Sequence, residues 1–280
     1  MLKKIVYLKD TDSGFPIFYA KLRNLPAISM KNEKISYVDF KYLFNKNKIF
    51  YENNKKNDFY YKPPSDYYIE NDIENKIIKD FKINILSKKY NVFISDREVY
   101  DETKKYIEKF ETKENLESFI KKYYGIDLKF FQEKYIKSYL LMHKLDLFLK
   151  NNKAINKNNI NKIETAENKI KNEDINFYTV ANEYNINEEL KESGGSIGWI
   201  EKKELLNAFE ELKDIEIKKG LITNILKNNN GYYILKIDNF DDSEKENEFV
   251  KVSIIKIPTI NLNEYLQKEF NNIRIKKYIR

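Results

Sequence analysis

The side chains able to take part in covalent or metal chemistry are few in this sequence. The chain of 280 residues has no cysteine and one histidine, His143. Disulfides and thiol catalysis are therefore impossible, and a zinc site with cysteine and histidine ligands is excluded. Catalysis that requires two imidazoles is excluded within a single chain. His143 lies in the apolar run Leu140-Leu-Met-His-Lys-Leu, so we expect an ordinary helix residue, and we expect neither a metal nor a cofactor.

The charge balance differs between the two halves of the chain. Residues 1–150 contain 30 Lys and Arg against 22 Asp and Glu, whereas residues 151–280 contain 21 against 22. The formal net charge of +7 therefore belongs to the first half. A basic excess can mark a nucleic-acid or membrane partner, but here lysine alternates with acidic residues along helical patterns. We expect a solvated mixed surface and no nucleic-acid partner; a nucleic-acid-associated protein is the alternative of another class.

Neither a membrane span nor a full export signal is visible in the sequence. No stretch has the roughly 18–20 apolar residues that a membrane-spanning helix needs. The start Met1-Leu2-Lys3-Lys4 resembles the basic region of a signal peptide, but the apolar run Ile5–Leu8 is short for the hydrophobic region that should follow. A cytoplasmic location therefore stays open.

The first part of the chain is expected to be helical. Residues 1–35 are predicted to be irregular, because prolines interrupt their short apolar runs. Helical periodicity starts after Ser36 and predicts a helical domain over residues 36–151, with a capping box at Ser95-Asp-Arg-Glu98. The Asn- and Lys-rich residues 151–160 predict a domain boundary.

The second part of the chain changes character. Two helical segments are expected over residues 162–181, and five of the seven glycines follow between residues 194 and 231. Residues 231–238 and 249–257 have the apolar pattern of two strands, which we expect to form an antiparallel hairpin around an acidic loop. Residues 259–280 are expected to add a C-terminal helix and strand. The predicted fold class is therefore α+β.

The glycine-rich segment resembles a known family. Ser193-Gly-Gly-Ser-Ile-Gly-Trp-Ile200 resembles the GGxLGW signature of parvulin-type peptidyl-prolyl isomerases. Further matches keep the order of the family, with Asp174-Ile-Asn-Phe177 upstream and Lys219-Gly220 and Gly231-Tyr-Tyr-Ile234 downstream. The resemblance implies a parvulin-like domain over residues 160–258, with a small antiparallel sheet flanked by helices.

The first half is similar to the N-terminal chaperone domain of SurA- and PrsA-type foldases. The resemblance rests on Ile35-Ser36, the helix start at Ser95, Tyr123-Tyr124-Gly125 and the helix Leu140–Phe148. It implies that the partners are unfolded or partially folded polypeptide clients. It also implies an extracytoplasmic or cell-envelope location.

One departure from the family concerns its first strand, which has the form sHILv. The polar residues 151–161 cannot supply this strand, but residues 249–257, which follow the domain, resemble it. The first and last strands of the family fold are antiparallel neighbours, so a hairpin would bring residues 249–257 into the vacant position with the same polarity. We therefore predict a circularly permuted domain; the alternative is an edge strand that leaves the position empty.

A second departure concerns the two active-site histidines of the family. Ile254 and Tyr233 occupy their positions in this alignment. By resemblance, Leu205 and Phe209, four residues apart on one helical face, are candidates for an apolar pocket that grips a proline ring. Ile254 and Trp199 are the other candidates for substrate binding, and Trp199 is also expected to pack the glycine-rich turn. The alternative for Leu205 and Phe209 is an ordinary place in the core.

Hydroxyl groups are the remaining candidates for catalysis. Tyr233 could replace a lost imidazole, and Ser253 and Thr223 could add hydrogen bonds; the alternative for each is a hydroxyl satisfied within the fold. The resemblance implies a peptidyl-prolyl cis-trans isomerase-like foldase that binds unfolded or proline-containing clients. The alternative is a catalytically inactive parvulin-like chaperone.

Overall fold

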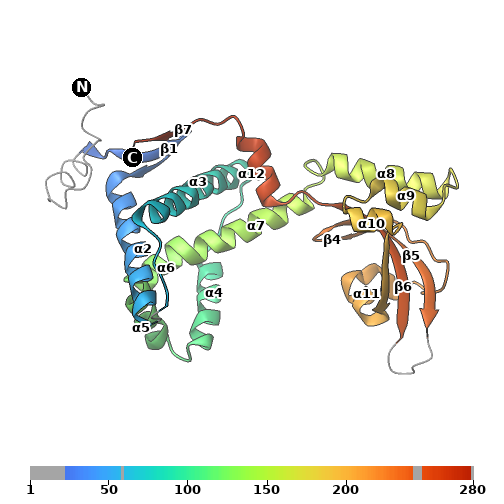
Figure 1. The fold of residues 1–280 in the computed structure, drawn as a ribbon, viewed down its shortest axis with the longest axis horizontal. Helices are drawn as coiled ribbons and strands as arrows, with labels where there is room; N and C mark the ends of the chain where they lie inside the picture. The colour runs from blue at the N-terminus through green and yellow to red at the C-terminus, as the bar shows by residue number, and fades with distance from the viewer. Residues whose placement is uncertain (1–22, 58–59, 242–247, 279–280) are drawn as a thin grey trace. The chain divides into compact units, whose positions relative to one another are not determined.

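The computed structural model describes residues 23–57, 60–241 and 248–278 (Figure 1). The chain folds into two compact units. Unit 1 comprises Met1–Leu145 and Asn263–Arg280, and unit 2 comprises Asp146–Leu262. Both units combine helices with a small antiparallel sheet, which agrees with the predicted α+β class.

The helices of unit 1 agree with the helical pattern of the sequence. The predicted capping box is present, since the Ser95 side chain accepts the N–H of Glu98 and the Glu98 carboxylate accepts the N–H of Ser95. The helix that contains the predicted segment Leu140–Phe148 begins directly after a π-helical turn. The helices are α2 (Tyr37–Asn57), α3 (Asp66–Tyr90), α4 (Asp96–Lys109), α5 (Lys113–Tyr124), α6 (Leu128–Phe131), the π-helical turn Gln132–Ile136, α7 (Lys137–Asn151), whose last residues belong to unit 2, and α12 (Leu262–Phe270).

A three-stranded sheet in unit 1 corrects one prediction. Strands β1 (Pro26–Met30) and β2 (Glu33–Ser36) form a hairpin, and β7 (Ile275–Lys277) pairs with the other side of β1. Residues 26–35 are therefore not irregular, and residues 1–22 lie outside the described residues. Strand β1 could not be predicted from the sequence, because it is short and its second partner lies at the far end of the chain.

Unit 2 contains the other sheet and the helices around it. Helix α8 begins at Lys157, so part of the predicted boundary at residues 151–160 is helical. The acidic loop at residues 242–247 lies outside the described residues. The elements are α8 (Lys157–Lys171), α9 (Phe177–Tyr184), α10 (Glu188–Glu192), β3 (Ser196–Glu201), α11 (Lys202–Ala208), the 3-10 helix Glu210–Asp214, β4 (Leu226–Asn228), β5 (Gly231–Asp241) and β6 (Phe249–Pro258).

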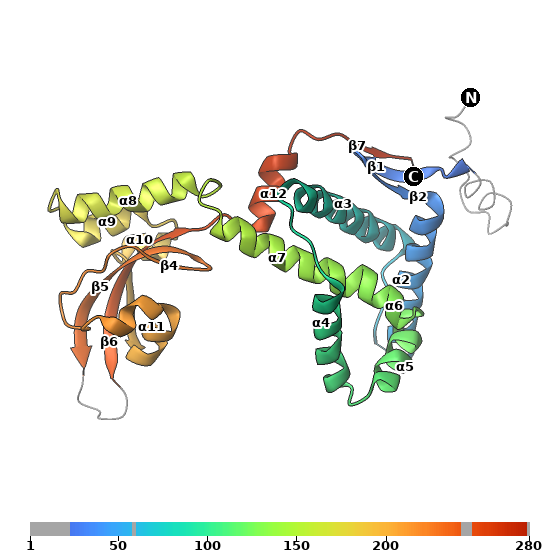
Figure 2. The ribbon, with the colours of Figure 1, turned by 180° about the vertical axis from the view of Figure 1, so that it is seen from behind.

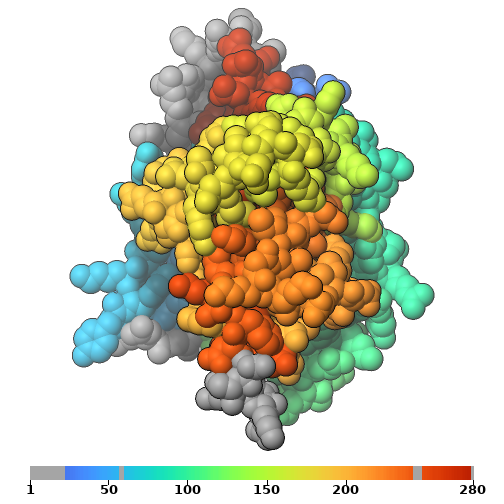
Figure 3. Space-filling view, turned by 90° about the vertical axis from the view of Figure 1, so that its right-hand side faces the viewer, coloured from blue at the N-terminus to red at the C-terminus, as the bar shows by residue number. Residues whose placement is uncertain are grey.

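The four strands of unit 2 lie in the order β3-β6-β5-β4, and all neighbours are antiparallel. Strand β6 is therefore an inner strand with partners on both sides. Helices α8 and α9 lie on one side of the sheet and α11 on the other (Figure 2). In Figure 3 the yellow residues of α8 and α9 gather above the orange residues that follow them in the chain.

Each face of this sheet has its own hydrophobic cluster, because successive side chains of a strand point to opposite faces. The cluster under α8 and α9, here called the α9 face, includes Val180, Tyr232, Ile234 and Ile255. The cluster under α11 and the 3-10 helix, here called the α11 face, includes Leu205, Phe209, Tyr233 and Leu235. Neighbouring residues of β5 thus contribute to two separate cores.

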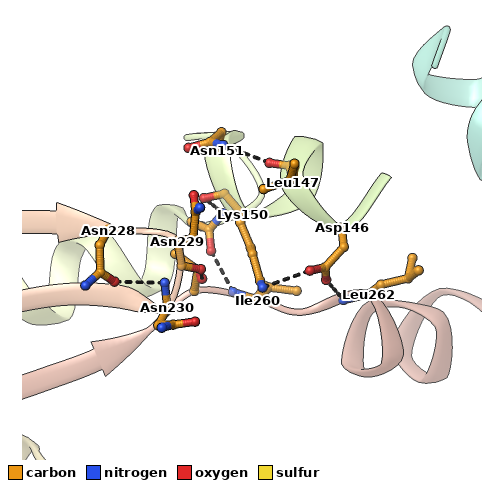
Figure 4. A network of polar contacts seen from close by, with 11 residues as sticks. Asp146, Leu147, Lys150, Asn151, Asn228, Asn229, Asn230, Ile260 and Leu262 are labelled. Atoms are coloured by element: carbon orange, nitrogen blue, oxygen red, sulfur yellow. Dashed lines mark hydrogen bonds and ion pairs between the residues drawn. The ribbon is translucent and has the colours of Figure 1, made fainter. Parts of the chain in front are cut away.

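A polar network joins the places where the chain enters and leaves unit 2 (Figure 4). The Asp146 carboxylate accepts the N–H of Leu262 at 2.8 Å and pairs with Lys150 at 2.8 Å. The fully buried Asn156 accepts the N–H of Ile260 and donates to the carbonyl of Leu149. The last turn of α7 therefore belongs to unit 2, and the unit boundary falls within that helix instead of at residues 151–160.

Candidate active site on the α11 face

Helix α11 brings two of the predicted pocket residues together. Leu205 and Phe209 are 3% and 6% exposed, and the N–H of Phe209 donates to the carbonyl of Leu205 at 3.1 Å. Phe209 ends the helix with an extended backbone, φ −141°. Both side chains belong to the hydrophobic cluster of the α11 face, which they share with Tyr233.

Tyr233 packs directly against Phe209. The ring centroids lie 4.9 Å apart at 69°, an edge-to-face arrangement. Tyr233 pairs across the sheet with Lys256, whose Nζ lies 5.6 Å from the centre of the Tyr233 ring. Ile254, half-buried on β6, packs against the same cluster. The structure therefore brings together Leu205, Phe209, Tyr233 and Ile254.

The ring of Tyr233 is buried, but its hydroxyl group is accessible. Within the described residues, this hydroxyl has no hydrogen-bond partner. No buried side-chain nitrogen or oxygen among them lacks a partner, so the Tyr233 oxygen must reach the surface. The cluster thus presents one hydroxyl group, available to a ligand, at the edge of an apolar patch.

Ser253 lies on the opposite side of the sheet from Tyr233. Its hydroxyl, which is fully buried, donates to the Asp238 carboxylate at 2.6 Å. The same carboxylate accepts the Tyr178 hydroxyl at 2.8 Å and lies 3.6 Å from the Lys236 ammonium group. Ser253 is therefore engaged in a bond that ties β6 to β5, and it cannot contact a ligand held against Tyr233.

Thr223 and Trp199 also lie apart from the Tyr233 hydroxyl. The Thr223 hydroxyl accepts the N–H of Leu235 at 3.0 Å, and Thr223 is 3% exposed, so its oxygen supports the main chain. Trp199 is 47% exposed on the outer strand β3 and is not part of the cluster of the α11 face. Of the three predicted catalytic hydroxyls, the structure leaves only that of Tyr233 without a partner.

Two polar residues near the site were not predicted from the sequence. Lys256 faces Tyr233 only because of the β5–β6 register, which the two strand patterns alone do not fix. The Asn185 amide, 2% exposed, donates to the carbonyl of Ile254 and accepts the N–H of Lys256. Asn185 thus bonds to the main chain of β6 at Ile254 and Lys256, just past the end of the pairing between β6 and β3.

The arrangement suits non-covalent recognition. An apolar surface with one hydroxyl and one nearby ammonium group can bind an apolar ring, exclude water from it and donate hydrogen bonds. Among the described residues, no group of three or more acidic or histidine side chains could hold a metal ion. No helix in the described part of the chain is long and apolar enough to cross a bilayer.

One comparison with known proteins matches a family model to residues that include part of this site. No curated protein matches the chain. Residues 142–239 match the family model of the rotamases, described as the PPIC-type PPIASE domain. The match runs from within α7 to residue 239 within β5, so it includes the predicted residues Leu205, Phe209 and Tyr233 and ends before β6. Residues 142–239 therefore form a PPIC-type peptidyl-prolyl isomerase domain of the parvulin type.

Proposed function

We propose that this protein is a peptidyl-prolyl cis-trans isomerase-like foldase that binds unfolded or proline-containing polypeptides. The observation that carries the proposal is the contact of Phe209 with Tyr233, in which an apolar surface carries a free hydroxyl. The proposal rests on the rotamase match over the same residues.

The reaction asks little of the side chains, because no covalent bond is made or broken. The barrier to rotation about a peptide bond is about 18–20 kcal/mol, and a twisted amide loses its resonance. Leu205 and Phe209 would hold the proline ring and exclude water. The Tyr233 hydroxyl would donate a hydrogen bond to the client main chain. An enzyme gains rate when such contacts are stronger in the twisted state than in the planar one.

We also propose that the domain is circularly permuted. Strand β6 follows the matched residues in the chain, and it lies between β3 and β5, antiparallel to both. This is the position expected for the family's first strand. The first half of the chain would then be the chaperone domain of a SurA- or PrsA-like foldase, and the location that relatives suggest is outside the cytoplasmic membrane or in the cell envelope.

A second candidate function is that of a catalytically inactive chaperone. Ile254 and Tyr233 occupy the two positions of the family's histidines, so the usual imidazoles are missing. Unit 1 also exposes large aromatic side chains, among them Tyr67, Phe93 and Tyr100 at 73%, 56% and 65%. Exposed aromatic residues can bind unfolded chains without catalysis.

Isomerisation kinetics separate the two candidates. The assay follows the cis-to-trans step of a short peptide with one Ala-Pro bond, which takes tens to hundreds of seconds unaided. We expect the wild-type protein to accelerate this step. Tyr233→Phe keeps the ring and removes the hydroxyl, so we expect a loss of about tenfold in kcat/KM, the effect of one hydrogen bond.

The control is Tyr232→Phe, because Tyr232 and Tyr233 are both 7% exposed but lie on opposite faces of the sheet. Its kcat/KM should equal that of the wild-type protein. If the wild-type protein gives no acceleration but suppresses aggregation of an unfolded client, the chaperone candidate replaces the isomerase. Equal rates for wild type and Tyr233→Phe would remove the hydroxyl from the mechanism.

A further inference from the structure

The outer strands of the two sheets differ in how well they are protected. Three of them are three or four residues long and contain lysine: β2 is Glu-Lys-Ile-Ser, β4 is Leu-Lys-Asn and β7 is Ile-Lys-Lys. Short, charged outer strands discourage pairing with another chain. Strand β3 has six residues, Ser-Ile-Gly-Trp-Ile-Glu, with a charge only at its end. It is the outer strand with the least protection among those that the structure describes.

The main chain of β3 presents hydrogen-bonding groups away from its neighbour β6. The N–H of Lys202 donates to the carbonyl of Glu248, just ahead of β6. In an antiparallel pair every second residue bonds to the neighbouring strand, so the main-chain groups of Ile200 and Gly198 also face β6. The N–H and C=O groups of Trp199 and the N–H of Glu201 therefore point out of the sheet, whereas the C=O of Glu201, the N-cap of α11, accepts the first hydrogen bond of that helix. These groups match the spacing of an extended peptide.

The surroundings of β3 are open and apolar. The Trp199 and Ile197 side chains are 47% and 40% exposed. A Cβ atom added to Gly198 would meet no atom within 4 Å. Lys251, the cross-strand neighbour of Trp199, is exposed and makes no ion pair within the described residues.

A shallow, open groove lined largely by polar residues adjoins the beginning of this strand. It has a volume of about 620 Å³, and its lining includes Tyr178 and Asn182 of α9 together with Ser193 and Gly194, just ahead of β3. Tyr178 is held there by its hydrogen bond to Asp238. Side chains of a peptide that extends past Ser196 could enter this groove.

We propose that the free edge of β3 binds an extended segment of polypeptide as an added strand. The segment would bond to the N–H and C=O of Trp199 and to the N–H of Glu201. It would place apolar side chains beside Trp199 and favour an acidic residue near Lys251. This added strand would be a second contact with a client, separate from the contact at Tyr233, and it extends the proposed foldase function. It requires no proline, so it can be tested independently of isomerisation.

A matched pair of variants tests the edge in the full-length protein. Glu201 has φ −62° and ψ 132°, values that proline adopts without strain. Glu201→Pro therefore removes the outward N–H, whereas the control Glu201→Ala removes only the carboxylate. The probe is a capped seven-residue peptide of alternating valine and threonine with one glutamate. Binding is followed by the emission of Trp199, the only tryptophan of the chain, which should shift to shorter wavelength.

We expect Glu201→Ala to bind the probe within about twofold of wild type, and Glu201→Pro about five- to tenfold more weakly, as for one lost hydrogen bond. Equal binding by the two variants would overturn the proposal. Should Glu201→Pro fail to fold, N-methylation of the alternate probe amides that face β3 must weaken binding to the wild-type protein; unchanged binding overturns the proposal. A wild-type dimer that Glu201→Pro dissociates would assign the edge to a second copy instead.

Discussion

The two faces of the four-stranded sheet in unit 2 use polar groups in different ways. On the α9 face, the hydroxyls of Tyr178 and Ser253 both donate to Asp238. On the α11 face, the Tyr233 hydroxyl has no partner among the described residues. A polar group without an internal partner is available to a ligand. The hydroxyls of Tyr178 and Ser253 are therefore structural, whereas that of Tyr233 is available for recognition beside Phe209. The Tyr232 hydroxyl, on the α9 face, also has no partner among the described residues.

Truncation of two neighbouring core residues on β5 is expected to have the largest effect on the free energy of unfolding. Ile234 and Leu235 are 0% and 1% exposed and point to the α9 and α11 faces, respectively. Truncation of a buried Ile or Leu to Ala costs about 2–5 kcal/mol. We expect Ile234→Ala to lose more stability than Leu235→Ala in urea unfolding, because the half-buried Ile254 adjoins the core of the α11 face. The opposite order would contradict the comparison.

The Asn185 amide provides the next test. Asn185→Ala removes two hydrogen bonds to β6 and leaves the Ile254 carbonyl and the Lys256 N–H without partners. An unpaired buried group costs about 1–3 kcal/mol. We expect a loss of about that size in the free energy of unfolding, measured with urea. A loss below about 0.5 kcal/mol would mean that water replaces the amide, since ordered water satisfies such groups well.

Removal of single hydroxyls compares the two faces directly. Ser253→Ala leaves the Asp238 carboxylate without one donor, so we expect a loss of about 1–2 kcal/mol. Tyr233→Phe removes a hydroxyl without an internal partner, so its free energy of unfolding should stay within about 0.5 kcal/mol of wild type. Thermal and urea unfolding of both variants measure this. Equal losses would mean that the Tyr233 hydroxyl is also structural.

Alkaline titration gives the smallest expected effect. Burial raises the pKa of Tyr232, on the α9 face, above its ordinary value of 10.0. A phenol with a raised pKa in the folded state supports folding below pH 10 and loses that contribution as the pH rises through the raised value. Wild-type stability should therefore fall more than that of Tyr232→Phe between pH 9 and pH 11. If the free energy of unfolding depends on pH in the same way for both proteins, the raised pKa of Tyr232 is contradicted.

Local signals in the sequence predicted much of the helical structure. The capping box at Ser95 depends on residues three positions apart, so it could be predicted without the tertiary structure. The prediction that Leu205 and Phe209 share one helical face is wrong in one respect, because α11 ends at Ala208 and Phe209 follows it with an extended backbone.

Pairing between strands was harder to predict. Strand β1 receives a partner from the other end of the chain, and no local pattern marks that contact. The β5–β6 register includes a bulge between Ile237 and Asn239, which turns Asp238 toward Ser253. Without that register, Ser253 could not be assigned to the face opposite Tyr233, nor Lys256 to the face that it shares with Tyr233.

The pairing of β1 with β7 has a consequence for synthesis on the ribosome. Ile28 pairs with Lys277, so the paired residues lie 249 positions apart in the chain. At about 5–20 residues per second, β1 waits on the order of 12–50 seconds for this partner. All of unit 2 is translated in that interval, because Asp146 and Leu262 both precede β7. The inserted unit can thus fold before the unit that surrounds it in sequence is complete.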